Sequence, residues 1–211
     1  MRKRNIALIL AASMMATFAF GGTTAFAAEE GETDSVTVGI MADPENMGPW
    51  SGMSMGRIAV LFTTYEYLIT REDGVAYGVL AKSWDEVDPK TYDVELYDYI
   101  HDAEGNPLTA SDVVFSFESA IATKNYGKLS VIDSVTATDD YHVEFKFNTD
   151  LEIGEFENVM LECAIVTQAA YEASPDQMAT TPVGTSAYLV DSYVPGSEIV
   201  MKDTGDYWQT D

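Results

Sequence analysis

One run of sixteen residues, Gly105–Ala120, constrains the fold most tightly, because it combines a turn, a helix start and an apolar helix face. It opens with the turn formers Gly105–Pro107, since glycine accepts positive φ and proline fixes φ. Thr109 is placed to cap a helix, with Asp112 three residues later in a capping-box-like arrangement. Apolar residues then recur at helical spacing: Val113, Val114, Phe117, Ala120 and Ile121. The sequence therefore predicts a turn followed by a capped amphipathic helix, as found in many mixed α/β proteins.

The N-terminus has the three parts of a secretory signal. A basic stretch, Arg2–Arg4, precedes a short apolar stretch, Ile6–Phe20, and Ala25–Ala27 forms a small-x-small cleavage site. We expect residues 1–27 to be a cleaved signal peptide and residues 28–34 to be a disordered mature N-terminus. The alternative is an uncleaved anchor, but the apolar stretch is short for a helix that spans a bilayer. No later segment is long and apolar enough to span one.

Cysteine and charge narrow the class of protein further. Cys163 is the only cysteine, so an intrachain disulfide is excluded. A lipid anchor is not expected either, because there is no cysteine near the cleavage site. Cys163 lies in the apolar run Val159–Val166 and is expected to be a small buried hydrophobe.

The chain is strongly acidic, with a formal net charge of −24. The signal holds three of the 11 basic residues and no acidic residue, so the net charge without the signal is −27. Such a chain does not bind nucleic acid through phosphates. The acidity is explained by surface solubility, with a cleft for cationic ligands as the alternative.

Patterns of apolar residues and turn formers predict a mixed α/β fold in the form of an α+β lobe. The clearest signal is a hairpin, because Val131–Thr138 and Tyr141–Asn148 are runs of strand formers joined at Asp139 and Asp140. The other expected elements are a strand Ser35–Ala42, a loop Asp43–Met55, a helix Gly56–Ile69, a turn Arg71–Gly74, a strand Tyr92–Leu96, a helix within Gly154–Ala173, and strands Tyr188–Tyr193 and Glu198–Lys202.

The amino-acid sequences of six segments resemble motifs of one protein family. Gly105–Ala120 is similar to the stretch "DGxPLTAEDVVFSFERA" of the family 5 extracellular solute-binding proteins, the dipeptide, oligopeptide and nickel receptors of ABC importers. Five more segments resemble family motifs in the family's order: Tyr65–Leu68 ("YEGL"), Leu80–Trp84 ("LAxSW"), Asp139–Val143 ("DDYTV"), Pro182–Tyr188 ("PVGTGPY") and Asp206–Trp208 ("PDYW"). Together they cover nearly the whole chain after the signal.

Departures from these motifs indicate a divergent member whose ligand differs from an ordinary peptide. Met47–Pro49 stands where the family often has "LDP", Tyr67 replaces a glycine, and Ser186-Ala187 replaces Gly-Pro. The segment Leu96–Gly105 lacks the family's basic residue. Family members are also much longer. The resemblance therefore implies an incomplete fold of the type II periplasmic-binding-protein kind in residues 35–211: the first lobe with a small extra domain, and no second lobe. The chain is then either a fragment or a truncated product.

The resemblance also implies a function and a site. It implies the substrate-binding component of an ABC importer, periplasmic or extracellular, which captures a peptide or similar small solute between two lobes and delivers it to a membrane permease. By position, the expected ligand-binding residues are first Trp50, Ser51, Met53, Ser54 and Met55, and second Thr185 and Ser186. Tryptophan and methionine offer adaptable apolar contact and serine offers hydrogen bonds. The alternative is that these side chains pack against the lobe. The residues expected in the core are Tyr65, Trp84, Phe115, Phe117 and Trp208.

Other chemistries have little support in the residues. Metal binding is not expected, because the only histidines are His101 and His142 and there is one cysteine. The run from Asp102 resembles the start of a calcium loop, but Pro107 and Val113 occupy positions that require glycine and glutamate. With nickel as ligand, the methionines and His101 would be the candidates. No catalytic residue and no cofactor are predicted. The alternatives to a receptor are a secreted hydrolase that uses two carboxylates and an acidic extracellular interaction protein.

Overall fold

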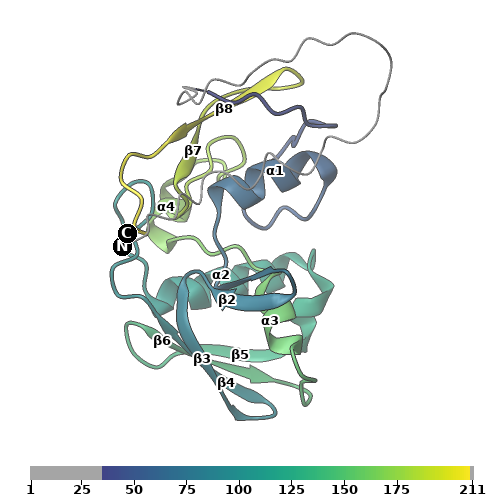
Figure 1. Cartoon of the computed structure of the whole chain (residues 1–211), viewed down its shortest axis with the longest axis vertical. Helices are drawn as coiled ribbons and strands as arrows, with labels where there is room; N and C mark the ends of the chain where they lie inside the picture. Colours follow the sequence, from purple (N-terminus) through teal and green to yellow (C-terminus); the bar gives the residue numbers. More distant parts are fainter. Residues whose placement is uncertain (1–34, 210–211) are drawn as a thin grey trace, which may run out of the picture. The chain divides into compact units, whose positions relative to one another are not determined.

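The computed structural model of the protein describes residues 35–209 (Figure 1). The predicted signal peptide, residues 1–27, and the segment 28–34 lie outside the described residues. Every helix and strand described below belongs to one compact unit, which begins at Gly39. In order, these elements are α1 (Met55–Thr64), β1 (Ile69–Glu72), β2 (Val75–Gly78), β3 (Ala81–Asp88), β4 (Thr91–Leu96), α2 (Ala110–Thr123), η2 (Gly127–Val131), β5 (Ile132–Ala137), β6 (His142–Phe147), α3 (Glu155–Met160), α4 (Gln168–Ala173), β7 (Tyr188–Val194) and β8 (Glu198–Asp203).

A four-stranded antiparallel sheet in the order β3-β4-β6-β5 is packed against α2 (Figure 1). The predicted hairpin is confirmed as β5 and β6, which pair Val135 with Phe145. Alternate residues of β6 are buried, so Phe145 lies fully inside, where its ring contacts Phe117 of α2 at a centroid distance of 4.9 Å. The mixed α/β class follows from this sheet-and-helix layer.

The predicted cap of α2 is present. The Asp112 carboxylate accepts hydrogen bonds from both the backbone N–H and the hydroxyl of Thr109, each at 2.8 Å. Its other oxygen accepts the backbone N–H of Gln168 at the start of α4, at 2.8 Å. One aspartate therefore begins one helix and holds the start of another. The apolar face of α2 is buried at Val113 and Phe117, as its spacing predicts.

A second, smaller layer forms around α1. Val60 of this helix packs with Met47 and with Val190 of β7 in an apolar cluster, and β7 pairs only with β8 in a two-stranded sheet. The next residue of α1, Leu61, belongs to the main core. The predicted strands Tyr188–Tyr193 and Glu198–Lys202 are confirmed as this pair.

One element prediction is wrong and three differ in their bounds from the structure. Ser35–Ala42 forms no strand, because no strand pairs with it among residues 35–209, and its alternating residues Val36 and Val38 are 79% and 73% exposed. The helix predicted over Gly56–Ile69 begins at Met55 and ends at Thr64, since the chain then turns extended at Tyr65. The turn expected over Arg71–Gly74 is shorter in the structure than predicted.

That turn consists of Asp73 and Gly74, both with positive φ (51° and 81°), as a two-residue hairpin turn requires, while Arg71 already lies in β1. The helix expected within Gly154–Ala173 is divided into α3 and α4. Between them the apolar run is buried and extended, and Glu66 and Ile165 form a bridge there. The run bonds to other parts of the chain instead of continuing a helix.

The core predictions are confirmed in most cases. Tyr65, Phe117 and Trp208 are buried, and so is Cys163, whose thiol pKa is raised by burial. Trp84 and Phe115 are partly buried and pack against the core. Within the part of the chain that the structure describes, no helix combines the length and apolar character needed to cross a bilayer.

Close packing of Gly184 against the end of α1 gives a test of this arrangement. A Cβ added at Gly184 would lie 1.9 Å from the carbonyl oxygen of Thr64, which is backbone and has nowhere to move. We therefore expect Gly184→Ala to lower the free energy of unfolding by at least about 2 kcal/mol, measured by urea denaturation. Gly127→Ala is the matched control, because nothing lies within 4 Å of its added Cβ. Equal stability of the two variants would contradict the contact.

Candidate functional site

The loop that precedes α1 is fixed from within by Arg57. Its guanidinium donates to the carbonyl oxygens of Asn46 (2.8 Å) and Ser51 (2.6 Å), so the only charged side chain of α1 is turned onto the loop backbone. Ser54 begins the helix, because its hydroxyl accepts the backbone N–H of Arg57 at 3.3 Å. These hydrogen bonds give the loop backbone a defined conformation.

Trp50 anchors this loop in the core. Its indole N–H donates to the carbonyl oxygen of Ala164 at 2.9 Å, and the side chain is only 4% exposed. Its ring contacts those of Phe115 and Tyr171, at centroid distances of 5.8 and 4.9 Å. The packing alternative thus accounts for every observed contact of Trp50, and ligand contact by this residue stays a prediction.

The remaining residues of the predicted loop differ in exposure. The Ser51 hydroxyl donates to the carbonyl oxygen of Gly48 at 2.7 Å, so it stabilises the loop. Met53 and Met55 are 51% and 64% exposed. The two methionines are therefore the side chains of this loop that offer apolar surface to a bound molecule.

A second loop, which sequence reasoning missed, supports the first. The Asn125 side chain donates to the carbonyl oxygen of Trp50 at 2.9 Å and lies 3.7 Å from the Cβ position of Gly52, which has a φ of +86°. It follows the C-terminal cap of α2, where Lys124 adopts the left-handed conformation. An asparagine directly after a predicted helix is a turn signal, but its partner lies far away in the sequence.

Thr185 and Ser186 do not join the loop. They follow Gly184, which packs on Thr64, whereas Ser54 lies at the other end of α1. Ten residues of α-helix separate the two places by about 15 Å. Thr185 is buried and its hydroxyl has no hydrogen-bond partner among the described residues, while Ser186 is partly buried. The structure thus brings the first set of predicted residues together and leaves the second set apart.

Thr185 lies instead near a partly buried acid, Glu66. The Glu66 carboxylate accepts the hydroxyl of Tyr207 at 2.5 Å and the indole N–H of Trp208 at 2.8 Å. Burial raises the pKa of Glu66, and these two hydrogen bonds oppose the rise only in part. Burial likewise raises the pKa of Tyr207. Glu66 therefore ties the C-terminal segment to the chain just after α1.

The run from Asp102 that resembles a calcium loop is a structural turn. The Asp102 carboxylate accepts the backbone N–H groups of Glu104 and Asn106, each at 2.9 Å, and the hydroxyl of Thr167 at 2.5 Å. Its oxygens are thereby used within the protein. Among residues 35–209, no group of three or more His, Cys, Asp or Glu side chains is placed to hold a metal ion.

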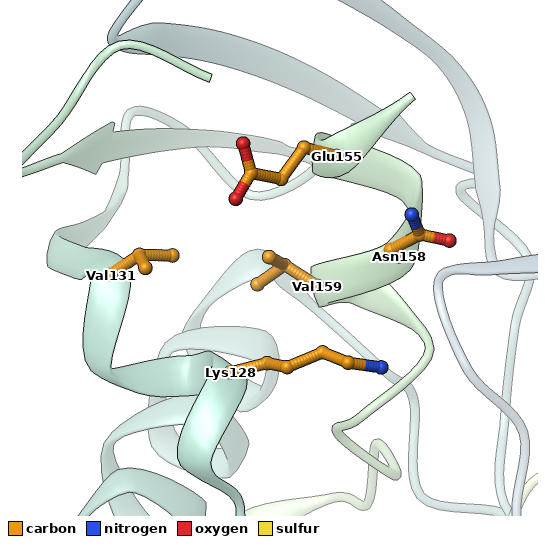
Figure 2. A pocket seen from close by; sticks show the side chains of 5 residues that line it. All are labelled: Lys128, Val131, Glu155, Asn158 and Val159. Atoms are coloured by element: carbon orange, nitrogen blue, oxygen red, sulfur yellow. The ribbon is translucent and has the colours of Figure 1, made fainter. Parts of the chain in front are cut away.

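A shallow groove of about 270 Å³ lies between η2 and α3 (Figure 2). Figure 2 shows Val159 at the centre of the lining residues, with Val131 to its left, Glu155 above and Lys128 below. The Lys128 ammonium already pairs with Glu162 at 2.5 Å. None of the predicted ligand-binding residues lines this groove, and it offers no convergent set of polar groups.

Comparison with known proteins gives a consistent result. The profile of the bacterial extracellular solute-binding proteins, family 5, matches residues 76–211. The nickel-binding protein NikA of Staphylococcus aureus is 30% identical over 142 residues, which are 66% of this chain and 28% of that protein. Di/tripeptide-binding protein 3 of Pseudomonas aeruginosa is 26% identical over 184 residues, which are 72% of this chain and 34% of that protein.

Solved structures agree on the fold. The oligopeptide-binding protein AppA of Bacillus subtilis, in complex with a nonapeptide, matches with a TM-score of 0.71 at 22% identity, over 80% of this chain and 36% of that one. NikA of S. aureus in complex with Ni(L-His)₂ matches with a TM-score of 0.65 at 26% identity, over 80% and 35%. These are type II periplasmic binding proteins, which confirms the predicted fold class. The chain spans about a third of the length of the relatives it matches. The loop Trp50–Met55 lies outside residues 76–211, the range that the family profile matches.

The anchoring of Trp50 can be tested by its effect on stability. We expect Trp50→Ala to lower the free energy of unfolding by about 3–5 kcal/mol, as for other buried aromatic side chains. Trp50→Phe keeps most of the packing but leaves the Ala164 carbonyl unpaired, and we expect it to cost about 1–3 kcal/mol. Both are measured by chemical denaturation, with Met53→Ala as the exposed control. A Trp50→Ala protein of unchanged stability would show that the indole is not a core anchor.

The environment of Glu66 predicts a dependence on pH. Because its pKa is raised in the folded protein, the folded state binds the proton more tightly than the unfolded state does. The stability that this group contributes is therefore present at low pH and is lost as the pH rises through the folded pKa. We expect Glu66→Gln to gain stability relative to the wild type as the pH rises above the unfolded-state pKa of the carboxyl group, measured by urea denaturation. The exposed Glu118→Gln is the control, and parallel pH profiles for all three proteins would refute the assignment.

Proposed function

The chain belongs to family 5 of the bacterial extracellular solute-binding proteins, and on that basis we propose that it is part of the substrate-binding component of an ABC importer. The relatives named above are binding proteins for nickel and for di- and tripeptides. We accordingly propose a non-enzymatic role, in which a peptide or another small solute, such as a nickel complex, is captured and passed to a membrane permease. Residues 35–211 would supply segments of the first lobe together with the small extra domain.

The observation that carries this proposal is the prearranged loop Trp50–Met55. Arg57 and Asn125 hold its backbone, and Trp50 anchors it, while Met53 and Met55 remain exposed. A ligand that binds here meets two flexible apolar side chains on a rigid backbone, which lowers the entropic cost of binding. Thr185 and Ser186, at the far end of α1, would contact only a solute that extends along the helix.

We also propose that the protein is exported to the periplasm or the cell exterior. The N-terminal residues 1–27 read as a cleavable signal without a lipid-attachment cysteine, and the family is described as extracellular. In that compartment the solute would be delivered to the importer from outside the membrane.

Methionine methyl signals provide a direct test of ligand contact. The protein is labelled with ¹³C at the methionine methyl groups and titrated with Ni(L-His)₂ or with a tripeptide mixture, because NMR detects even millimolar binding. We expect saturable shifts of the Met53 and Met55 signals, assigned with Met53→Leu and Met55→Leu. Met41 is the internal control, since it is 87% exposed and lies outside the loop.

A variant without the two loop methionines tests how much they contribute to affinity. Replacing both loop methionines with alanine removes apolar contact worth about 1.5 kcal/mol or more, so we expect at least a tenfold weaker Kd. Shifts of Met41 as large as those of Met53, or no saturable shift with either probe, would contradict the proposed site. Turnover of the peptides would favour a hydrolase instead.

A further inference from the structure

We propose that Met41, Met53 and Met55 form a binding site for Cu(I), a soft monovalent metal ion, with their three thioether sulfurs as ligands. Two of these methionines belong to the candidate ligand loop. The inference nevertheless goes beyond the proposed import role, because the metal site needs neither a peptide nor a permease.

Exposed methionines occur at one place in the described chain. Met41, Met53 and Met55 are 87%, 51% and 64% exposed. The other four methionines among residues 35–209 are buried or partly buried: Met47, Met160, Met178 and Met201. Because methionine is an apolar residue that is usually buried, three exposed thioethers within 15 positions call for a reason other than packing.

The backbone at Ser54 directs two of these side chains to the same side. Ser54 is extended, with φ −144° and ψ 160°. In an extended segment the side chains of residues i and i+2 lie on one face, so Met53 and Met55 do so here. Ser54 is also fixed, since its hydroxyl accepts the backbone N–H of Arg57 at 3.3 Å. The two thioethers therefore extend from a backbone that is held in place.

Met41 reaches the same place from a different segment. The carbonyl oxygen of Ala42 lies 2.6 Å from the position of a Cβ added to Gly56, so the two backbones are in contact there. Met41 directly precedes Ala42, and Met55 directly precedes Gly56, so both methionines flank this contact. Methionine has three rotatable side-chain bonds, which let the sulfurs converge on one ion without movement of the backbone.

The sulfur ligands determine which metal is expected. Thioethers are soft ligands that favour Cu(I), whereas imidazole suits Zn²⁺ and Ni²⁺ and oxygen ligands suit Mg²⁺ and Ca²⁺. The two histidines lie elsewhere, His101 in a bridge with Pro107 and His142 in β6. The Cys163 thiol is fully buried and does not compete for the ion. The net charge of −24 in addition attracts cations to the protein.

Titration with Ag(I) tests the site, because Ag(I) is as soft as Cu(I) and is stable in air. Silver nitrate is added, without chloride, to the full chain labelled with ¹³C at the methionine methyl groups and carrying Cys163→Ala to remove the thiol. We expect the signals of Met41, Met53 and Met55 to shift together and to saturate at one ion per chain. The signal of the buried Met160 should stay in place, and Zn²⁺ should shift none of the four.

Single substitutions in the same background test whether all three sulfurs are ligands. We expect Met41→Leu and Met55→Leu each to weaken the Kd for Ag(I) at least about tenfold, since changes even outside the first ligand shell cost that much in other metal sites. Met201→Leu is the matched control, because this partly buried methionine lies in β8. Leucine conserves the apolar volume, and thermal unfolding without silver checks that each variant is folded.

Several results would overturn the metal site. They are a shift of Met53 and Met55 without Met41, an unchanged Kd in Met41→Leu, and equal shifts with Zn²⁺. A saturable response to the peptides without a response to Ag(I) would refute the metal site and leave the proposed solute site intact. The converse result would support the metal site and refute the solute site.

Discussion

The buried segment Cys163–Thr167 determines how the parts of this fold are held together. It lies inside the core but outside the described sheets, so its polar groups are bonded to side chains and backbone from distant parts of the chain. The pairs are Ala164 with Trp50 (2.9 Å), Ile165 with Glu66 (2.9 Å), Val166 with Ser116 (3.1 and 3.2 Å) and Thr167 with Asp102 (2.5 Å). A buried polar group without a partner costs about 1–3 kcal/mol. This segment therefore holds together the loop before α1, the connection between α1 and β1, helix α2 and the Asp102 turn.

The candidate ligand loop is held in place by its contact with this buried segment. Trp50 reaches Ala164, and Asn125 and Arg57 then hold the loop backbone between Trp50 and α1. Met53 is consequently an exposed side chain on a backbone that is held at several points. Trp50 is buried although it lies in a loop, because its indole N–H bonds to Ala164 and its ring packs on Phe115 and Tyr171.

Local signals in the sequence were enough for some elements and not for others. The Thr109–Asp112 cap and the β5–β6 hairpin were predictable because their determinants are neighbours in the chain. The sequence predicts a helix within Gly154–Ala173 but does not show that the apolar run around Cys163 divides it, since an unbroken apolar stretch has no period that distinguishes a buried strand from a helix. The end of α1 depends on Gly184, and the support of Trp50 depends on Asn125, both distant in sequence. The loop could therefore be located from the sequence, but the separation of buried Trp50 from exposed Met53 could not.

The position of α1 links the candidate ligand loop to both apolar clusters of the fold. Met55 begins the helix and belongs to the loop, and the following turns of the same helix place Val60 in one cluster and Leu61 in the other. Arg57 bonds the helix to the loop backbone, so the helix and the loop are held together. A solute that contacts the exposed methionines would therefore gain affinity by burying their apolar surface, and not by rearranging the loop that carries them.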